Sequence, residues 1–420
     1  METPAAMVIR CGTLLDGLGR SDRNVAVSIA GGRIADVRSW AEAGREPGIP
    51  VVDAGGMTVM PGLFDCHDHL AAPSGSLIER SRTPASLHVL RVAETMRGML
   101  QMGFTTVRDA GGLDLGLKLA VEEGLLAGPR VLISLAIITQ TAGLADATNA
   151  AGFNADVLRL PGAPDGVCDG IDQARLMTRR LIRAGADFIK IATTGGVSSR
   201  ISGVLTREFS FDEVRAVVAE AGAFGRPVAA HAYGGEGLKN ALRAGVHSVE
   251  HLGPLDDEDI ETMVRQKTYL VPTLLNMHVR LEMAHEPGAL SAYSIEKAAE
   301  LAPLQHKAFA RAHRAGVRIA AGTDSRGLRP GGNAHELGLL VKYGMSPMEA
   351  IRAATSTAAG CCNLADAGRI APGMRADLIA VDGDPIDEIE LLEDATRIAL
   401  VVRDGATYKN TIGAERGGRR

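Results

Sequence analysis

The chain lacks the features that would place it in a membrane, on a secretory route or on a nucleic acid. None of its apolar runs reaches the roughly 20 residues of a membrane-spanning helix, and no charged segment followed by an apolar one marks a signal peptide at its start. The formal net charge is -5 with both signs intermixed, so no basic face for nucleic acid or an anionic membrane is indicated. We therefore expect a cytoplasmic protein that binds neither.

Cysteine is also scarce. The 420 residues contain five cysteines, an odd number that argues against a disulfide scaffold. Hydrophobic residues make up 46% of the chain, which is enough for a substantial core. The length fits one barrel-sized domain together with a small one, or two or three ordinary domains.

The middle of the chain alternates between strand-like and helix-like segments. The expected strands are 57–64, 104–109, 130–135, 187–191, 227–231, 247–251, 268–273 and 318–324. Helices are expected between and after them, among them 211–224 with Ser210 as N-cap, a helical pair over 294–315 and one helix over 347–359. A doubly wound sheet shares this alternation, but eight repeats without Gly-x-Gly-x-x-Gly after the first strand favour a (β/α)8 TIM barrel of the α/β class.

Both ends of the chain have a different, strand-rich texture. The expected terminal strands are 7–10, 24–29 and 33–37, with Gly31-Gly32 as a hairpin turn, and 377–381 and 398–405. Neither end could form a sandwich alone, so we expect both to build one small β-sandwich domain. The predicted division is 1–58 and 366–420 for the β-sandwich and 59–365 for the barrel.

The first barrel strand ends in a His-x-His pair. Alternate side chains of an extended segment share one face, so the imidazoles of His67 and His69 should point the same way. Two converging imidazoles can hold a metal ion. Alone, the pair is equally compatible with two polar loop residues.

Four further residues lie where later strands end, at the rim on which barrel enzymes place their chemistry. They are Lys190, His231, His251 and Asp324. Singly, they could be a surface lysine, core histidines and a helix cap. Together at one rim they indicate a metal site, and Lys190 within an apolar run is the most telling, because a buried ammonium is costly unless neutralised.

Several motifs resemble those of the amidohydrolase superfamily, in the branch of imidazolonepropionase-like proteins, Xaa-Pro dipeptidases and ochratoxin-degrading amidohydrolases. The similarity covers nearly the whole chain. The motifs are Pro61-Gly62-Leu63-Phe64-Asp65-Cys66-His67-Asp68-His69, Thr105-Thr106-Val107-Arg108-Asp109, Gly185-Ala186-Asp187-Phe188-Ile189-Lys190, Ala230-His231-Ala232-Tyr233, Ser248-Val249-Glu250-His251, Gly322-Thr323-Asp324 and 368–378.

This resemblance implies two divalent metal ions, most simply zinc. One would be bound by His67, His69 and Asp324, and the other by His231 and His251. A carboxylated Lys190 would bridge them, which turns a buried cation into an anion. A hydroxide activated by both ions would attack the carbonyl, with Asp324 taking its proton and passing it to the leaving amine.

Substrate-binding residues are less firmly indicated. The resemblance makes Tyr233 a partner for a substrate carboxylate, although it could be a packing residue. Arg200 could reach a carboxylate or be a solvated loop arginine, and His335 could line the pocket or merely open a helix. The dipeptidase branch has a histidine where this chain has Leu144. That difference favours a more apolar pocket, beside the long 139–169 segment that we expect to act as a lid or binding loop.

We therefore expect a binuclear metal-dependent hydrolase acting on the amide bond of a small N-acyl amino acid or dipeptide-like substrate, ochratoxin-type amides among them. The alternative is hydrolysis of an aryl amide, urea or carbamate, which Leu144 favours. A ring aminohydrolase fits less well, because its usual His-x-x-Glu is absent after His231. A scaffold without activity fits less well too, since no metal ligand is missing. We expect a homo-oligomer.

Overall fold

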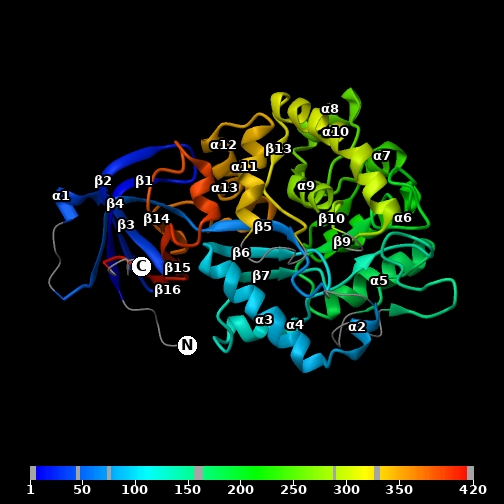
Figure 1. The fold of residues 1–420 in the computed structure, drawn as a ribbon, viewed down its shortest axis with the longest axis horizontal. Helices are drawn as coiled ribbons and strands as arrows, with labels where there is room; N and C mark the ends of the chain where they lie inside the picture. The colour runs from blue at the N-terminus through cyan, green and yellow to red at the C-terminus, as the bar shows by residue number, and fades with distance from the viewer. Residues whose placement is uncertain are drawn as a thin grey trace.

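The computed structural model describes residues 6–43, 48–72, 77–155, 164–286, 290–325 and 332–413. Two regions are distinct in Figure 1: strands from both ends of the chain lie on one side, and the alternating strands and helices of the middle lie on the other. The α/β class is confirmed. Among the described residues, no helix is both long and apolar enough to cross a membrane.

Strands from both termini form a single seven-stranded sheet, in the order β16-β15-β14-β4-β1-β2-β3. The antiparallel pairing of β4 with β14 joins the two ends of the chain, and Gly31-Gly32 turns between β2 and β3 as expected. The sheet has its own apolar core, with Ile9, Val27 and Leu400 among its members. The bounds are β1 (Met7–Leu15), β2 (Ser21–Ala30), β3 (Arg33–Ser39), β4 (Val51–Pro61), β14 (Leu378–Val381), β15 (Ile398–Arg403) and β16 (Ala406–Asn410), with α1 (Trp40–Ala43) after β3.

The middle of the chain forms two parallel sheets. The first has three strands, β5 (Leu63–Asp68), β6 (Phe104–Asp109) and β7 (Arg130–Ile133). The second has six, β8 (Ile137–Ile138), β9 (Ile189–Ala192), β10 (Val228–His231), β11 (Ser248–Glu250), β12 (Tyr269–Val271) and β13 (Arg318–Ile319). Three backbone hydrogen bonds join the sheets beyond β13: Cys66 N donates to Ala321 O (2.9 Å), and Thr323 N (3.1 Å) and Asp324 N (2.6 Å) both donate to His67 O.

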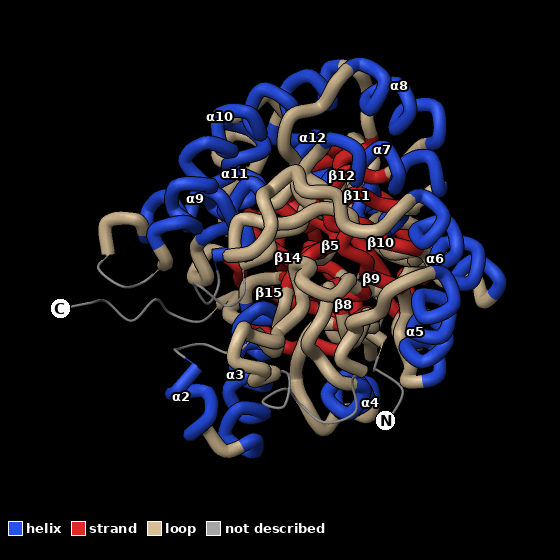
Figure 2. Tube along the Cα trace, turned by 90° about the vertical axis from the view of Figure 1, so that its right-hand side faces the viewer, coloured by secondary structure: helices blue, strands red, loops and turns tan. Residues whose placement is uncertain are grey.

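Helices surround these strands, as Figure 2 shows with the strands in red at the centre. Their bounds are α2 (Leu77–Arg82), α3 (Ala85–Gln101), α4 (Leu115–Glu122), α5 (Ile171–Arg183), α6 (Phe211–Ala223), α7 (Gly235–Ala244), α8 (Asp257–Gln266), α9 (Leu274–Met283), α10 (Ala292–Arg314), α11 (His335–Lys342), α12 (Pro347–Ala353) and α13 (Ser356–Cys361), with short 3-10 helices at Gly332–Ala334 and Ile389–Glu393. The capping box that Ser210 forms with Glu213 at α6 confirms the predicted start of that helix.

The predicted strand 57–64 is wrong. The chain leaves the terminal sheet at the end of β4 and enters the central region at β5, with Gly62 between them. A Cβ at Gly62 would lie 2.3 Å from the side chain of Thr105, so the crossing point has no room for a larger residue. The apolar run 57–64 therefore passes from the terminal sheet to the central three-stranded sheet, and its hydrophobic pattern gives no sign of the boundary.

Two helix predictions also need correction. The expected pair over 294–315 is one continuous helix, α10, which accommodates Pro303. The expected single helix over 347–359 is two, α12 and α13, because Thr355 between them leaves the helical conformation (φ -132°, ψ -96°). Helix α9 and the short strand β8 were not predicted.

Candidate active site

Four buried imidazoles lie in a row at the carboxyl ends of the central strands. Ring centroids are 5.4 Å apart for His69 and His67, 4.7 Å for His67 and His251, and 4.4 Å for His251 and His231. His67 belongs to β5 and His231 ends β10, while His69 and His251 directly follow β5 and β11. Sequence analysis placed all four at one rim, and the structure brings them together there.

Each imidazole uses one ring nitrogen to contact an oxygen of the protein. The contacts are His67 Nδ1 with Glu250 Oε2 (2.8 Å), His69 Nδ1 with Gly111 O (2.7 Å), His251 Nδ1 with Thr273 Oγ1 (2.8 Å) and His231 Nε2 with Gly195 O (3.0 Å). Such contacts are typical of metal-ligating histidines, because they fix the ring and direct the opposite nitrogen to the ion. His67 Nε2 is buried and has no hydrogen-bond partner among the described residues, as expected of a ligand atom.

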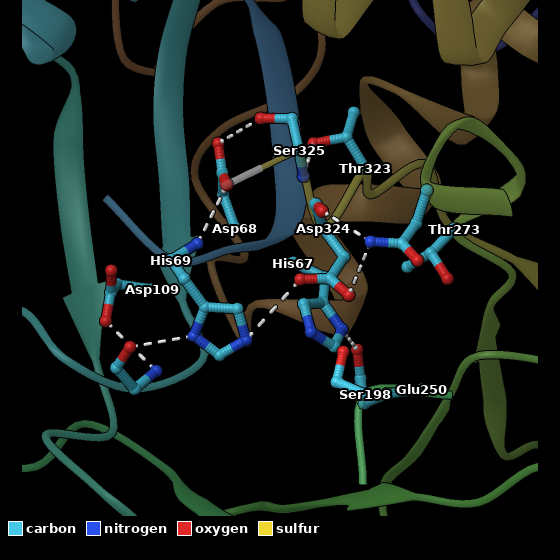
Figure 3. Close-up of polar contacts among 12 residues, drawn as sticks. His67, Asp68, His69, Asp109, Ser198, Glu250, Thr273, Thr323, Asp324 and Ser325 are labelled. Atoms are coloured by element: carbon cyan, nitrogen blue, oxygen red, sulfur yellow. Dashed lines mark hydrogen bonds and ion pairs between the residues drawn. The ribbon is translucent and has the colours of Figure 1, made fainter. Parts of the chain in front are cut away.

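Asp324 completes a compact donor set. Ligand atoms of His67, His251 and Asp324 all lie within 4.8 Å of one another. On the other side, Asp324 Oδ1 is 3.6 Å from His69 Nε2, a pair visible in Figure 3. His251 and Asp324 both have left-handed backbone conformations (φ 71° and 47°), a strain that concentrates at functional sites.

Lys190 lies on β9 and is only 1% exposed. Burial, and next the positive charge of Lys190, lower the pKa of His231 to about 3 and also lower the pKa of His67. Both rings are therefore neutral at physiological pH, which is the form that binds metal. A cationic Lys190 beside these rings would oppose binding of a dication.

A cavity of about 420 Å³ opens over these side chains. All six predicted metal ligands line it, namely His67, His69, Lys190, His231, His251 and Asp324. Tyr233 lines it as well, with its ring stacked 5.2 Å from that of His251. The rest of the wall mixes apolar residues, including Ile137, Leu144 and Val197, with the polar residues His88, Asp146, Ser198 and Arg280.

The family model described as the amidohydrolase family matches residues 58–407. The chain belongs to the amidohydrolase family. Ochratoxinase from Aspergillus niger is 32% identical over 426 residues, covering 96% of this chain and 86% of that protein. The crystal structure of a Xaa-Pro dipeptidase with bound methionine in its active site has a TM-score of 0.87 at 32% identity, covering 97% of this chain and 100% of that one. A prolidase complexed with N-methylphosphonate-L-proline gives a TM-score of 0.89 with the same identity and coverage. These relatives match the branch that the motifs indicated.

Two predicted substrate-binding residues of this amidohydrolase lie elsewhere. Arg200 is exposed and is not among the residues that line the active-site cavity. His335 contacts Glu393 (Nδ1 to Oε1 3.0 Å) and lines a separate cavity of about 80 Å³. Their positions do not support the substrate contacts predicted for them. The sequence around a loop arginine or a histidine at a helix start does not indicate which way its side chain points.

The amidohydrolase site contains a buried ion pair that sequence analysis missed. Arg108 Nη2 donates to Glu250 Oε1 (2.6 Å), while Glu250 Oε2 contacts His67 Nδ1. Burial would raise the pKa of Glu250, but the charges of Arg108 and Lys190 and the contact with His67 hold it below its usual range. Glu250 is therefore an anion that fixes His67. Arg108 and Glu250 both belong to the motifs quoted above, and membership of those motifs is the only sign of the ion pair in the sequence.

The predicted lid is partly described. Leu144, Ala145 and Asp146 line the amidohydrolase cavity, and residues 156–163 of the 139–169 segment lie outside the described residues. Leu144 packs on Gly196, where an added Cβ would come within 2.5 Å of Leu144 Cδ1 and 3.4 Å of His231 Nε2. An apolar group thus lies beside the predicted metal ligands.

Proposed function

We propose that this protein is a binuclear metal-dependent amidohydrolase that cleaves the amide bond of a small N-acyl amino acid or dipeptide-like substrate, ochratoxin-type amides among them. The observation that carries the proposal is the buried donor set of His67, His251 and Asp324, with an orphaned nitrogen on His67. The names of the relatives, an ochratoxinase and Xaa-Pro dipeptidases, support an amide with an amino-acid leaving group.

The residues present fit two divalent cations, and zinc suits their imidazole and carboxylate donors. His67, His69 and Asp324 would hold one ion, and His231 and His251 the other. Lys190 would bridge them after its amine adds carbon dioxide and loses a proton, which replaces the buried cation with a carbamate anion. Bound ions supply Lewis acidity that activates water and polarises the substrate carbonyl.

The chain's own groups orient the substrate and move the proton. Asn276 Nδ2 donates to Asp324 Oδ2 (3.0 Å), which leaves Oδ1 toward His69 to take a proton from the attacking water. Asp324 then returns that proton to the amine as the carbon–nitrogen bond breaks. Tyr233, buried beside His231 and His251, would contact the substrate carboxylate.

The same proposal extends to the architecture. The two parallel sheets, joined by hydrogen bonds beyond β13, would form one (β/α)8 barrel of residues 59–365. The seven-stranded terminal sheet, whose strand β4 runs on to Pro61, would have to curl over its own core to give the small β-sandwich domain predicted for residues 1–58 and 366–420. We propose that the protein acts as a cytoplasmic homo-oligomer on a small-molecule amide, with no nucleic-acid or membrane partner.

A second candidate function rests on Leu144. Its side chain lines the cavity where the dipeptidase branch has a histidine, and it cannot donate a hydrogen bond to a carboxylate. An aryl amide, urea or carbamate without a carboxylate would suit this wall.

Metal removal and reconstitution, followed by a substrate panel, test the proposal. We expect the chelated protein to be inactive and about two zinc ions per chain to restore release of free amino acids from N-acyl amino acids and Xaa-Pro dipeptides. Activity confined to ureas or carbamates would establish the second candidate instead. Full activity in the metal-free protein would contradict both.

A further inference from the structure

Arg280 is a buried cation in the wall of the active-site cavity. The reaction proposed above assigns it no role. It lies on α9, is 6% exposed, and lines the cavity together with Ser198 and Tyr233. A buried guanidinium next to a reaction site is well suited to bind an anion, because its planar fork matches a carboxylate in two parallel hydrogen bonds.

The guanidinium is held in a fixed orientation. Nε donates to Asn276 Oδ1 (2.8 Å), Nη1 to Ser294 Oγ (2.9 Å) and Nη2 to Ser198 Oγ (2.9 Å). The acceptors in these three contacts are an amide oxygen and two hydroxyls, all neutral. They fix the orientation of the guanidinium.

The loop that carries Ser198 is anchored as well. Lys297 Nζ, on α10, donates to the carbonyl oxygens of Ser199 (2.6 Å) and Ser202 (2.8 Å). Ser294 belongs to the same helix. Helices α9 and α10 therefore present Arg280 on a rigid frame, which lowers the entropy lost when a ligand binds.

Asn276 ties Arg280 to the proposed proton carrier. Its Oδ1 accepts from Arg280 Nε, and its Nδ2 donates to Asp324 Oδ2 (3.0 Å) and to Asp324 O (2.9 Å). The guanidinium and the Asp324 carboxylate thus lie two hydrogen bonds apart, on opposite ends of one side-chain amide. In an amino-acid leaving group, a single carbon separates the carboxylate from the scissile nitrogen, so a carboxylate receptor must lie this near the reacting atoms.

We propose that Arg280 binds the carboxylate of the amino-acid part of the substrate and so restricts the enzyme to amides that bear a free carboxylate. The proposal rests on the proposed function and narrows its substrate class. Arg280 would thus bind the carboxylate in place of Arg200, the residue that sequence analysis suggested. It would do so together with Tyr233.

Binding of L-phenylalanine and of its uncharged relative L-phenylalaninamide tests this assignment without requiring turnover. Calorimetry on the zinc-loaded protein should show that Arg280→Met raises the Kd for phenylalanine about 10- to 100-fold. The Kd for phenylalaninamide should change less than about 3-fold. Arg280→Lys, which keeps the charge but loses the fork, should fall between the wild type and Arg280→Met for phenylalanine.

Arg215→Met is the matched control, because Arg215 is an exposed arginine on α6 paired with Asp212. It should leave both Kd values unchanged. The proposal is overturned if Arg280→Met weakens both ligands equally, or if wild type does not prefer the carboxylate. Failure of the proposed function would appear separately, as no amide hydrolysis by a zinc-loaded wild type that still binds phenylalanine through Arg280.

Discussion

At the residue scale, the site depends on charges that never reach the substrate. Glu250 is fully buried and lies between Arg108 and His67, and Ser248 Oγ donates to the same carboxylate oxygen as Arg108. A buried anion is stable only with such partners. Because Glu250 accepts from His67 Nδ1, it also directs His67 Nε2 to the cavity.

Glu250→Gln should therefore lower both the free energy of unfolding and the affinity for zinc. The variant leaves the buried Arg108 guanidinium without its anion, which we expect to cost about 3–5 kcal/mol of the free energy of unfolding. Loss of the contact that orients His67 should weaken zinc binding about 10- to 100-fold. Denaturant unfolding and competition with a zinc chelator measure the two effects, and the exposed Glu261→Gln on α8 serves as control. Unchanged zinc affinity would contradict the orienting role.

Side chains that end strands could be found from the sequence, because the strand pattern itself places them at one rim. Their supporting partners could not. Asn276 and Asp324 are 48 residues apart, and Arg108 and Glu250 are 142 apart. No local pattern marks such contacts, since they exist only once the strands have assembled.

At the element scale, a buried carboxyl fastens the loop that forms part of the cavity wall. Glu208 accepts hydrogen bonds from Leu144 N (2.5 Å) and from Thr139 Oγ1 (3.0 Å). Burial raises the pKa of Glu208 to about 7, against these two hydrogen bonds, which lower it. The carboxyl group of Glu208, which holds this loop, therefore titrates near physiological pH.

The pH dependence of unfolding should reveal this carboxyl. Its folded pKa is above the ordinary value of 4.5, so its stabilising contribution is complete below about 4.5 and is lost as the pH rises through about 7. The free energy of unfolding of the wild type should fall relative to that of Glu208→Gln between pH 5 and pH 8. Chemical denaturation at several pH values measures this difference, in which the titration of other buried carboxyls cancels. Parallel curves for the two proteins would show that Glu208 does not titrate in this range.

Helices with local start signals were predictable, and α9 was not. Ser210 caps α6 from within the chain segment itself, with Glu213 completing the capping box. At the start of α9, by contrast, Glu336 from α11 accepts from Leu274 N (3.0 Å) and Leu275 N (2.7 Å). The capping carboxyl of Glu336 lies 62 residues after Leu274 and 61 after Leu275, so the sequence around the start of α9 carries no sign of it. Missing α9 also meant missing Arg280.

At the scale of the whole molecule, a charged cluster connects the terminal sheet to the central region. Arg130, on β7, contacts Asp377 (Nη1 to Oδ2 2.7 Å) and Asp404 (Nη2 to Oδ1 2.6 Å). Asp377 also accepts from Asp404 N (2.7 Å), and its carbonyl accepts from Gly62 N at the crossing between the sheets. The ends of the chain are thereby held to the start of the catalytic region.

Asp377→Asn should lower stability without changing the chemistry. Removing one anion from the largely buried Arg130 should cost about 3 kcal/mol of the free energy of unfolding. The turnover number per zinc-loaded, folded chain should stay that of the wild type, because none of these residues lines the cavity. The control Asp22→Asn removes the surface pair with Arg20 and should cost less than about 1 kcal/mol. A large fall in turnover at full zinc content would instead show that the junction shapes the active site.

The central claim is that two metal ions bind among His67, His69, His231, His251 and Asp324 and are bridged by a carboxylated Lys190. Anomalous diffraction at the zinc edge, from crystals of wild type and of Lys190→Ala grown with zinc, tests it most directly. We predict two wild-type peaks about 3.5–4 Å apart, with extra density on Lys190, and reduced or missing peaks in the variant. An active wild-type enzyme with no peak among these six side chains, or a variant with both peaks and full activity, would contradict it.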